Sequence, residues 1–270
     1  MKSAITISLV TEARGGPFVF SDLPGGCRQA KELGFEAVEI FPPSADAVRE
    51  LRVDQFLAGE GLKLAAMGTG AGWLKNKWTL TSPDASIRNQ ACAFVRSLID
   101  VAGPLGAPVI IGSLQGRWGD TATQEKALGW LSESLNQLGA QASQYNVPLL
   151  FEPLNRYETN MCNTIADGVE LIKSMNTKNV LLLADLFHMN IEEVDIAAAL
   201  RAGGKHIGHV HFVDSNRRPA GAGHLDYGPI VAALRDINYT GYLSAEALPW
   251  PDPAAAAKQT IEQFNRLTSL

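Results

Sequence analysis

Short apolar runs alternate with longer helical patterns along the whole chain, eight of each. The apolar runs are rich in Val, Ile and Leu without strict alternation, as in strands of a parallel sheet buried on both faces. They lie near residues 4–9, 36–40, 62–67, 108–112, 147–152, 180–185, 207–212 and 241–246. The helical patterns lie near residues 22–33, 46–60, 84–103, 122–145, 163–175, 191–202, 228–237 and 253–268. Eight strand–helix units in 270 residues predict an α/β fold, one (β/α)8 barrel domain over residues 1–270.

Residues that start and stop helices agree with this plan. Gly34 and Gly61 follow helical segments, where a left-handed C-terminal cap favours glycine. Asn163 and Asp226 precede later segments, and both residue types cap helix N-termini. The main rival fold, an open doubly wound sheet, needs a Gly-rich nucleotide turn after an early strand. Residues 11–16, Thr-Glu-Ala-Arg-Gly-Gly, follow the first strand and are not such a turn.

Composition and charge exclude several classes of protein. The net charge of −5 argues against nucleic acid as a partner, because phosphate binding needs a basic face. The sequence contains no apolar stretch of about 20 residues, so we expect no transmembrane helix and no membrane partner. The first ten residues are typical of a strand rather than a signal peptide. Cys27, Cys92 and Cys162 are few and widely spaced, which indicates reduced thiols in a cytoplasmic protein.

Four polar residues stand where four successive apolar runs end: Glu152, Asp185, His211 and Glu246. They are 33, 26 and 35 residues apart, and each spacing is close to one strand-plus-helix unit. In a parallel barrel these strand ends meet at the carboxyl-end mouth, where barrel enzymes have their active sites. Three carboxylates converging there would repel one another unless a divalent cation lay between them. The sequence therefore predicts a metal-dependent enzyme.

The donor types indicate which metals would bind. Carboxylate oxygens with one imidazole favour Mn²⁺, Mg²⁺ or Co²⁺ over a thiol-selective metal, and Zn²⁺ stays open. A single acid at a strand end is usually a loop carboxylate or a helix cap. The inference depends on four such residues in register, because a buried carboxylate is costly unless it is paired or metal-bound.

Two further histidines lie close to these residues in the sequence. His188 follows Asp185 by three residues, and at the barrel mouth it is suited to donate a hydrogen bond to a substrate; the alternative is an ordinary loop histidine. His209 precedes His211 by two residues, so strand alternation puts both on one face. We interpret His209 as a barrel-interior residue behind the ligands rather than a fifth ligand.

The loops after the strands supply candidates for substrate contacts. Arg217 and Arg218 follow the seventh strand, where one of them is suited to hold a hydroxyl, carboxylate or phosphate; a surface pair is the alternative. Glu158 could accept hydrogen bonds from sugar hydroxyls, or it could be a solvent-facing acid. Loop tryptophans that could wall a sugar pocket are Trp73, Trp78 and Trp118.

Several sequence blocks resemble one enzyme family. The blocks are Glu-Pro-Leu-Asn-Arg-Tyr-Glu (152–158), Ala-Asp-Leu-Phe-His-Met-Asn-Ile-Glu-Glu (184–193), His-Val-His-Phe-Val-Asp-Ser-Asn-Arg (209–217) and Ala-Gly-Ala-Gly-His-Leu-Asp-Tyr (220–227). They resemble the ketose 3-epimerase group of the xylose isomerase-like barrel superfamily, which includes D-tagatose and D-psicose 3-epimerases. Met-Gly-Thr-Gly (67–70) and Leu-Thr-Ser-Pro-Asp (80–84) more closely resemble its 5-keto-L-gluconate epimerase branch.

The resemblance implies roles for individual residues. The implied metal ligands are Glu152, Asp185, His211 and Glu246, with Mn²⁺ as the first candidate and Mg²⁺ or Co²⁺ as alternatives. Glu152 and Glu246 would also be the acid/base pair, and Glu158, His188 and Arg217 would contact the substrate. The family also implies a homo-oligomer, a dimer or a tetramer.

The predicted activity is epimerisation beside the ketone of a ketose or keto sugar acid, with a 5-keto-L-gluconate-like compound or a free ketohexose as substrate. Aldose–ketose isomerisation is the main alternative, and a non-catalytic sugar-binding barrel is a weaker one. A phosphorylated substrate is disfavoured because residues 247–253 lack the Gly-rich amide nest of a barrel phosphate site. DNA repair endonuclease activity is disfavoured by the five histidines and the negative charge.

Overall fold

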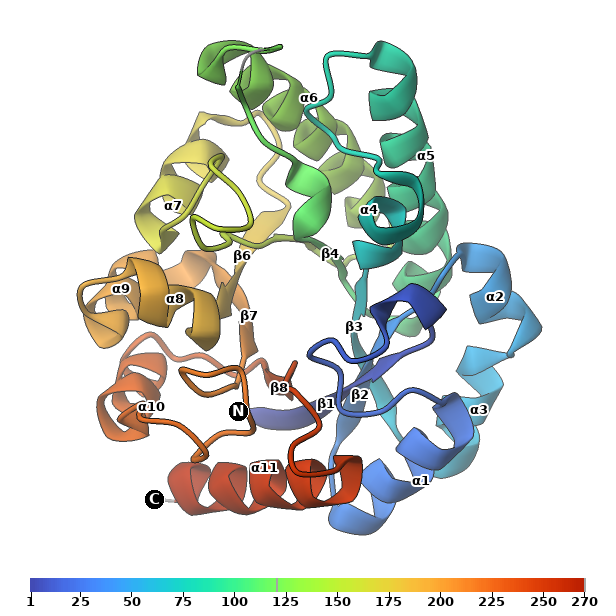
Figure 1. Ribbon diagram of the computed structural model, residues 1–270, viewed down its shortest axis with the longest axis vertical. Coiled ribbons are helices and arrows are strands. Elements are labelled where there is room, and N and C mark those ends of the chain that lie inside the picture. Colours follow the sequence, from blue (N-terminus) through green and yellow to red (C-terminus); the bar gives the residue numbers. More distant parts are fainter. Residues whose placement is uncertain (120, 270) are drawn as a thin grey trace.

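Eight parallel strands pair in chain order and close into a barrel, because the first strand also pairs with the last. The computed structural model describes residues 1–119 and 121–269. The barrel surrounds the centre of Figure 1, with the helices outside it. The strands are β1 (Lys2–Ser8), β2 (Ala37–Phe41), β3 (Lys63–Gly68), β4 (Val109–Ile111), β5 (Leu149–Phe151), β6 (Val180–Asp185), β7 (Ile207–His211) and β8 (Tyr242–Ala245). The predicted (β/α)8 barrel is confirmed.

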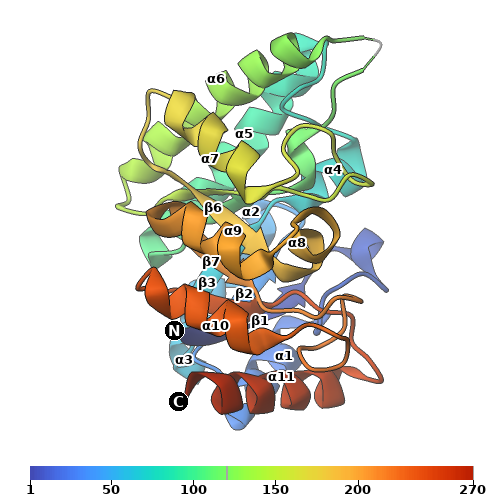
Figure 2. The ribbon, with the colours of Figure 1, turned by 90° about the vertical axis from the view of Figure 1, so that its left-hand side faces the viewer.

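Helices form an outer layer around the barrel (Figures 1 and 2). The α-helices are α1 (Leu23–Leu33), α2 (Ala45–Glu50), α3 (Val53–Glu60), α4 (Gly70–Asn76), α5 (Ala85–Ala102), α6 (Gln124–Ser143), α7 (Ile165–Ser174), α8 (Leu186–Glu192), α9 (Ile196–Gly203), α10 (Tyr227–Asp236) and α11 (Pro253–Thr268). Short 3₁₀ turns are η1 (Thr11–Ala13), η2 (Gly103–Leu105), η3 (Ser113–Gln115) and η4 (Gly204–His206). Within the part of the chain described, no helix combines the length and the apolar character needed to cross a bilayer.

Three helical expectations need correction. The segment 46–60 is two helices, because Arg52 adopts a left-handed conformation (φ 50°) between α2 and α3. The segment 191–202 is likewise divided between α8 and α9, and Asp195 caps the second by accepting a hydrogen bond from the Ala198 amide. The short helix α4 was not expected.

The predicted caps are mostly confirmed. Gly34 and Gly61 have left-handed φ angles of 87° and 68°, and Asp226 caps α10. Asn163 is not a cap; the neighbouring Thr164 caps α7 instead, in a reciprocal capping box with Asp167.

The core has an outer and an inner part. The larger cluster fills the space between strands and helices, and includes Ile5, Val38 and Ile40. Inside the barrel, strand alternation places smaller sets such as Ala66, Ile110, Leu150 and Leu183. Toward the carboxyl ends of the strands the buried residues become polar, and Glu39 on β2 is fully buried. The fold therefore gathers buried polar groups at one end of the barrel.

Candidate metal centre and active site

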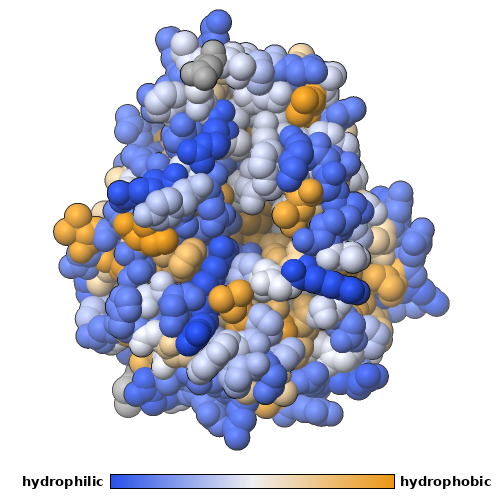
Figure 3. Space-filling model, viewed as in Figure 1, coloured by the Kyte–Doolittle hydropathy of each residue, from blue (hydrophilic) through white to orange (hydrophobic). Residues whose placement is uncertain are grey.

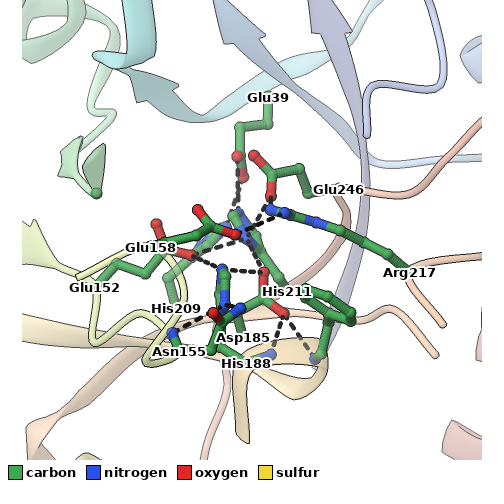
Figure 4. A network of polar contacts seen from close by, with 12 residues as sticks. Glu39, Glu152, Asn155, Glu158, Asp185, His188, His209, His211, Arg217 and Glu246 are labelled. Atoms are coloured by element: carbon green, nitrogen blue, oxygen red, sulfur yellow. Dashed lines mark hydrogen bonds and ion pairs between the residues drawn. The ribbon is translucent and has the colours of Figure 1, made fainter. Parts of the chain in front are cut away.

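The four polar residues at the ends of β5 to β8 converge in the barrel mouth (Figure 4). Glu152 directly follows β5, Asp185 and His211 end β6 and β7, and Glu246 directly follows β8. All four are buried, and each offers a donor atom within 4.8 Å of the others. His211 Nδ1 lies 3.2 Å from Asp185 Oδ2 and 3.6 Å from an oxygen of each glutamate. The structure therefore brings the whole predicted ligand set together.

The local structure fixes two of these side chains. Asp185 is the N-cap of α8, and its Oδ1 accepts hydrogen bonds from the amides of Phe187 (2.7 Å) and His188 (3.4 Å). This leaves Oδ2 directed at the other predicted ligands. A Cβ atom at Gly112 would lie 2.6 Å from Glu152 Oε2, so the glycine leaves the space that the carboxylate occupies. Glu152 and Glu246 enter the site from opposite sides in Figure 4.

Burial dominates the electrostatics of the site. It raises the pKa of Glu152 well above its ordinary value, and the charges of Glu246 and Asp185 add to this effect. Burial also raises the pKa of Glu246, although Arg217 opposes the shift. For Asp185, burial raises the pKa, but His188 and His211 outweigh burial and the net pKa is lowered. A divalent cation would favour the ionised form of all three carboxylates.

Unpartnered polar atoms show that the residues fit such a cation. Among the residues that the structure describes, Glu152 Oε1 and His188 Nε2 are buried without a hydrogen-bond partner. An unsatisfied buried carboxylate oxygen is unfavourable unless it binds a proton, a donor or a metal. Three carboxylates and one imidazole are also the donors that Mn²⁺ and similar ions accept. The site is therefore a candidate metal centre.

His188 presents a hydrogen-bond donor to the same space. Its Nδ1 accepts from the backbone amide of Asn155 at 3.2 Å and lies 2.8 Å from the Asn155 side-chain nitrogen. Because Nδ1 accepts from this amide, the neutral ring carries its proton on Nε2, and burial favours the neutral ring by lowering the pKa of His188. Nε2 lies 3.9 Å from Glu152 and 3.8 Å from Asp185. A substrate oxygen in the site could therefore accept this proton in a hydrogen bond.

Arg217 joins two of the carboxylates that line the cavity in the barrel mouth. Its Nη2 donates to Glu246 Oε2 at 2.7 Å, and its Nη1 donates to Glu158 Oε1 at 3.3 Å. The guanidinium also lies over the Phe187 ring, 4.9 Å from its centroid. Arg218, the next residue of the loop, lies over the Trp250 ring instead. Of the two arginines, Arg217 is the one that joins the site.

The loop that carries Arg217 is tied together by one buried carboxylate. Asp214 accepts hydrogen bonds from the amides of Ser215, Gly221 and Leu225, at 2.8 to 3.1 Å. Arg217 itself has a left-handed φ of 58°, and its amide donates to the Asp214 carbonyl. The loop therefore presents the guanidinium from a rigid turn.

A cavity of about 400 Å³ opens above the metal centre, and Figure 3 shows the hollow in the surface. Its polar lining includes Glu152, Glu158, Arg217 and Glu246. Its opposite wall belongs to the segment after β1 and to the ends of β2 to β4, and it includes the charged residues Glu12 and Arg14 as well as apolar ones. Phe18 and Phe41 are part of this wall, with ring centroids 4.5 Å apart. The cavity thus has an aromatic patch facing the candidate metal centre, with charged residues on both sides.

The three loop tryptophans are outside the lining identified for this cavity. Trp73 lies under the Lys77 ammonium, Trp78 packs against Phe94, and Trp118 donates to the Asn160 carbonyl. The expectation that they wall the pocket is therefore wrong for the described residues, and Phe18 and Phe41 provide its aromatic wall.

Sequence reasoning missed Glu39 and Asn155. Glu39 is fully buried and contacts both His209 and His211, as Figure 4 shows. An acid inside the apolar run Ala-Val-Glu-Ile-Phe is a signal that could have identified it, since both faces of such a strand are buried. The structure places His209 in the barrel interior, as expected.

Comparisons with known proteins identify the family. The model of the xylose isomerase-like TIM barrel family matches residues 27–267. The D-psicose 3-epimerase of Ruminiclostridium cellulolyticum is 33% identical over 222 residues, which cover 80% of this chain and 74% of that protein. The 3-dehydro-D-guloside 4-epimerase of Escherichia coli is 38% identical over 132 residues, which cover 48% of this chain and 50% of that protein.

A solved structure extends this similarity over the full barrel. The crystal structure of D-psicose 3-epimerase with D-tagatose from Clostridium cellulolyticum H10 matches with a TM-score of 0.79 and 26% identity, covering 98% of each chain. The chain therefore belongs to the xylose isomerase-like TIM barrel family, in which it joins the carbohydrate epimerases of the ketose 3-epimerase group.

Proposed function

We propose that this protein is a divalent-metal-dependent epimerase that inverts the carbon beside the ketone of a ketose or keto sugar acid. One observation carries the proposal: two buried glutamates from β5 and β8 enter one metal-type site from opposite sides. Inversion needs one group to remove a proton from one face and another to return a proton to the other face. A sugar-binding protein without catalytic activity has no need of such a pair.

Glu152, Asp185, His211 and Glu246 are the proposed metal ligands. We propose Mn²⁺ as the bound ion, with Mg²⁺ or Co²⁺ as alternatives, because the donors are three carboxylates and one imidazole. Bound there, the ion would polarise the ketone and supply the positive charge that stabilises an enediolate.

Glu152 and Glu246 are the proposed acid/base pair. One carboxylate takes the proton from the carbon beside the ketone, and the other delivers a proton to the opposite face of that carbon. Arg217 holds Glu246 through the 2.7 Å hydrogen bond, which fixes one oxygen of the carboxylate. Glu152 Oε1 has no hydrogen-bond partner among the described residues, so its lone pairs face the site.

His188, Arg217 and Glu158 are the proposed substrate contacts. The Nε2 proton of His188 is placed to hydrogen-bond a substrate oxygen near the ligands. Glu158 is 37% exposed at its side chain and accepts from Arg217, so it can also accept from a sugar hydroxyl. The adjacent Phe18 and Phe41 rings in the cavity lining suit the C–H face of a sugar.

The proposed substrate is a free ketohexose or a 5-keto-L-gluconate-like sugar acid. The named relatives act on ketoses and on a keto-glycoside, which supports a keto sugar as the substrate class. The resemblance of residues 67–70 and 80–84 to the keto-gluconate branch supports the acid.

The test is incubation of Mn²⁺-loaded protein in D₂O with ketohexoses, keto sugar acids and their phosphates, followed by chelation and NMR. Deuterium beside the ketone together with an inverted product would support the proposal and identify the substrate. Deuterium at C1 with an aldose product would indicate an isomerase instead. Absence of exchange with every sugar, in folded and metal-loaded protein, would contradict proton transfer.

We also propose that the chain assembles into a dimer or tetramer in the cytoplasm. The membership of the family supports the assembly, and the free cysteines Cys27, Cys92 and Cys162 are compatible with a reducing compartment. Light scattering at several protein concentrations would measure the assembly.

A further inference from the structure

Glu39 is a fully buried carboxylate on β2 that no proton-transfer step uses. Its two oxygens are divided between two histidines: Oε2 lies 2.7 Å from His209 Nε2, and Oε1 lies 3.0 Å from His211 Nε2. An ionised carboxylate in a dry interior is unfavourable unless hydrogen bonds compensate for its lost hydration. Glu39 receives such compensation from two ring N–H groups, so its position is specified on both sides.

The contact with His211 determines which nitrogen of that ring faces the metal centre. Nε2 is occupied by Glu39, whereas Nδ1 faces Asp185 Oδ2 at 3.2 Å and the two glutamates at 3.6 Å. A carboxylate that accepts the Nε2 proton leaves the lone pair of a neutral ring on Nδ1. This lone pair is the one that a cation among the four ligands would need.

His209 holds the second oxygen of the Glu39 carboxylate. It lies on the same strand as His211, two residues earlier, and the two rings stand nearly perpendicular with centroids 5.7 Å apart. Because β2 and β7 are not neighbours in the barrel, the Glu39 contacts cross its interior rather than run along a strand pair. Figure 4 shows Glu39 above the His211 ring and Asp185 below it.

We propose that Glu39 is a positioning residue that sets the metal affinity of the centre, because it holds the tautomer and orientation of His211. The inference rests on the proposed metal-dependent function. Its rival is that Glu39, His209 and His211, whose donor atoms also lie within 4.8 Å of one another, are themselves the ligands of a second cation. In the proposed arrangement both Nε2 atoms carry protons donated to Glu39, so they are not free to bind a metal.

The first test compares Mn²⁺ binding to wild type, Glu39→Gln and Glu39→Leu, with the free-ion signal measured by electron paramagnetic resonance. Loss of an outer carboxylate partner typically weakens metal binding by about 10- to 100-fold. We expect wild type to bind one Mn²⁺ per chain. The Mn²⁺ dissociation constant should be raised by that factor in Glu39→Leu, and it should also be higher than wild type in Glu39→Gln. Glu36→Gln, three residues earlier on an exposed side chain, is the matched control and should bind as wild type does.

The second test observes the His211 ring directly. Nitrogen-15 NMR of protein loaded with diamagnetic Zn²⁺ should show the His211 proton on Nε2 in wild type and a loss of that signal in Glu39→Leu. A purely structural role would lower the melting temperature of the apoprotein without changing this signal.

Two results would overturn the proposal. One is a folded Glu39→Leu variant that binds Mn²⁺ with the wild-type dissociation constant. The other is a wild type that binds two Mn²⁺ per chain and a variant that loses one of them. If wild type itself binds no divalent cation, the proposed metal-dependent function is wrong. That result is distinct from a failure of the Glu39 proposal, in which wild type binds the cation and the variant binds it equally well.

Discussion

Replacing each of the two proposed acid/base glutamates by glutamine should separate their two proposed proton-transfer roles. Glu152 and Glu246 are 6% and 7% exposed, and glutamine has nearly the same shape, so packing should be retained. In Glu246→Gln the amide oxygen can still accept from Arg217, where the carboxylate now accepts at 2.7 Å. The apoprotein should therefore lose no more than about 3 kcal/mol of unfolding free energy, the value of a hydrogen bond to a charged group.

The effect on catalysis should be much larger than the effect on stability. An amide cannot take a proton from carbon, and a general base contributes about 10²- to 10⁴-fold in rate. This corresponds to about 2.7 to 5.5 kcal/mol in the activation barrier. Because the two glutamates enter from opposite sides, each variant keeps the base for one face of the carbon. We expect neither variant to interconvert the epimers, while each exchanges the C–H proton of a different epimer with solvent.

The assay follows both epimers separately in D₂O at saturating Mn²⁺, with chelation before NMR. Metal content is measured in parallel, since each substitution also weakens a ligand. Turnover close to wild type in metal-loaded Glu246→Gln would refute the two-base reasoning. Exchange of the same epimer by both variants would refute the assignment of opposite faces.

Three further predictions concern the bound metal, His188 and Gly68. Chelation should abolish activity, and Mn²⁺ at 100 times its dissociation constant should restore it and add about 2.7 kcal/mol of stability, measured as a rise in melting temperature; an unchanged melting temperature would argue against the metal centre. His188→Gln should lower kcat/KM by about 10-fold or more, the loss of one hydrogen bond to a substrate, while the Mn²⁺ dissociation constant measured by titration stays within about twofold. A large change in that constant would show that His188 is a ligand. Gly68→Ala should destabilise the fold by about 1–3 kcal/mol in urea unfolding, because its Cβ would overlap the Phe41 ring. Gly129→Ala, in open space on α6, is its control and should be neutral or stabilising.

The positions of the strands could be predicted because a strand of a closed parallel barrel is buried on both faces, so its sequence is a run of apolar residues. The positions at which the helices break could not be predicted. Arg52 separates α2 from α3 by adopting a left-handed conformation, although no proline or glycine in the sequence marks a helix break at this position. Helix α4 contains two glycines in seven residues, and forms because Ala71 and Gly72 are buried against the core. Local propensity is a weak signal where packing supplies most of the stability of a helix.

The sequence by itself determined the barrel and the four residues at its mouth. Each of those residues ends an apolar run, and in a closed parallel barrel the carboxyl ends of successive strands lie side by side, so residues one strand–helix unit apart along the chain come together. Only the tertiary structure decided what surrounds them. Glu39 meets His211 across 172 residues of sequence, and Arg217 meets Glu246 from a loop on another strand. Such contacts depend on how side chains cross the barrel interior, and periodicity along the chain carries no information about that direction.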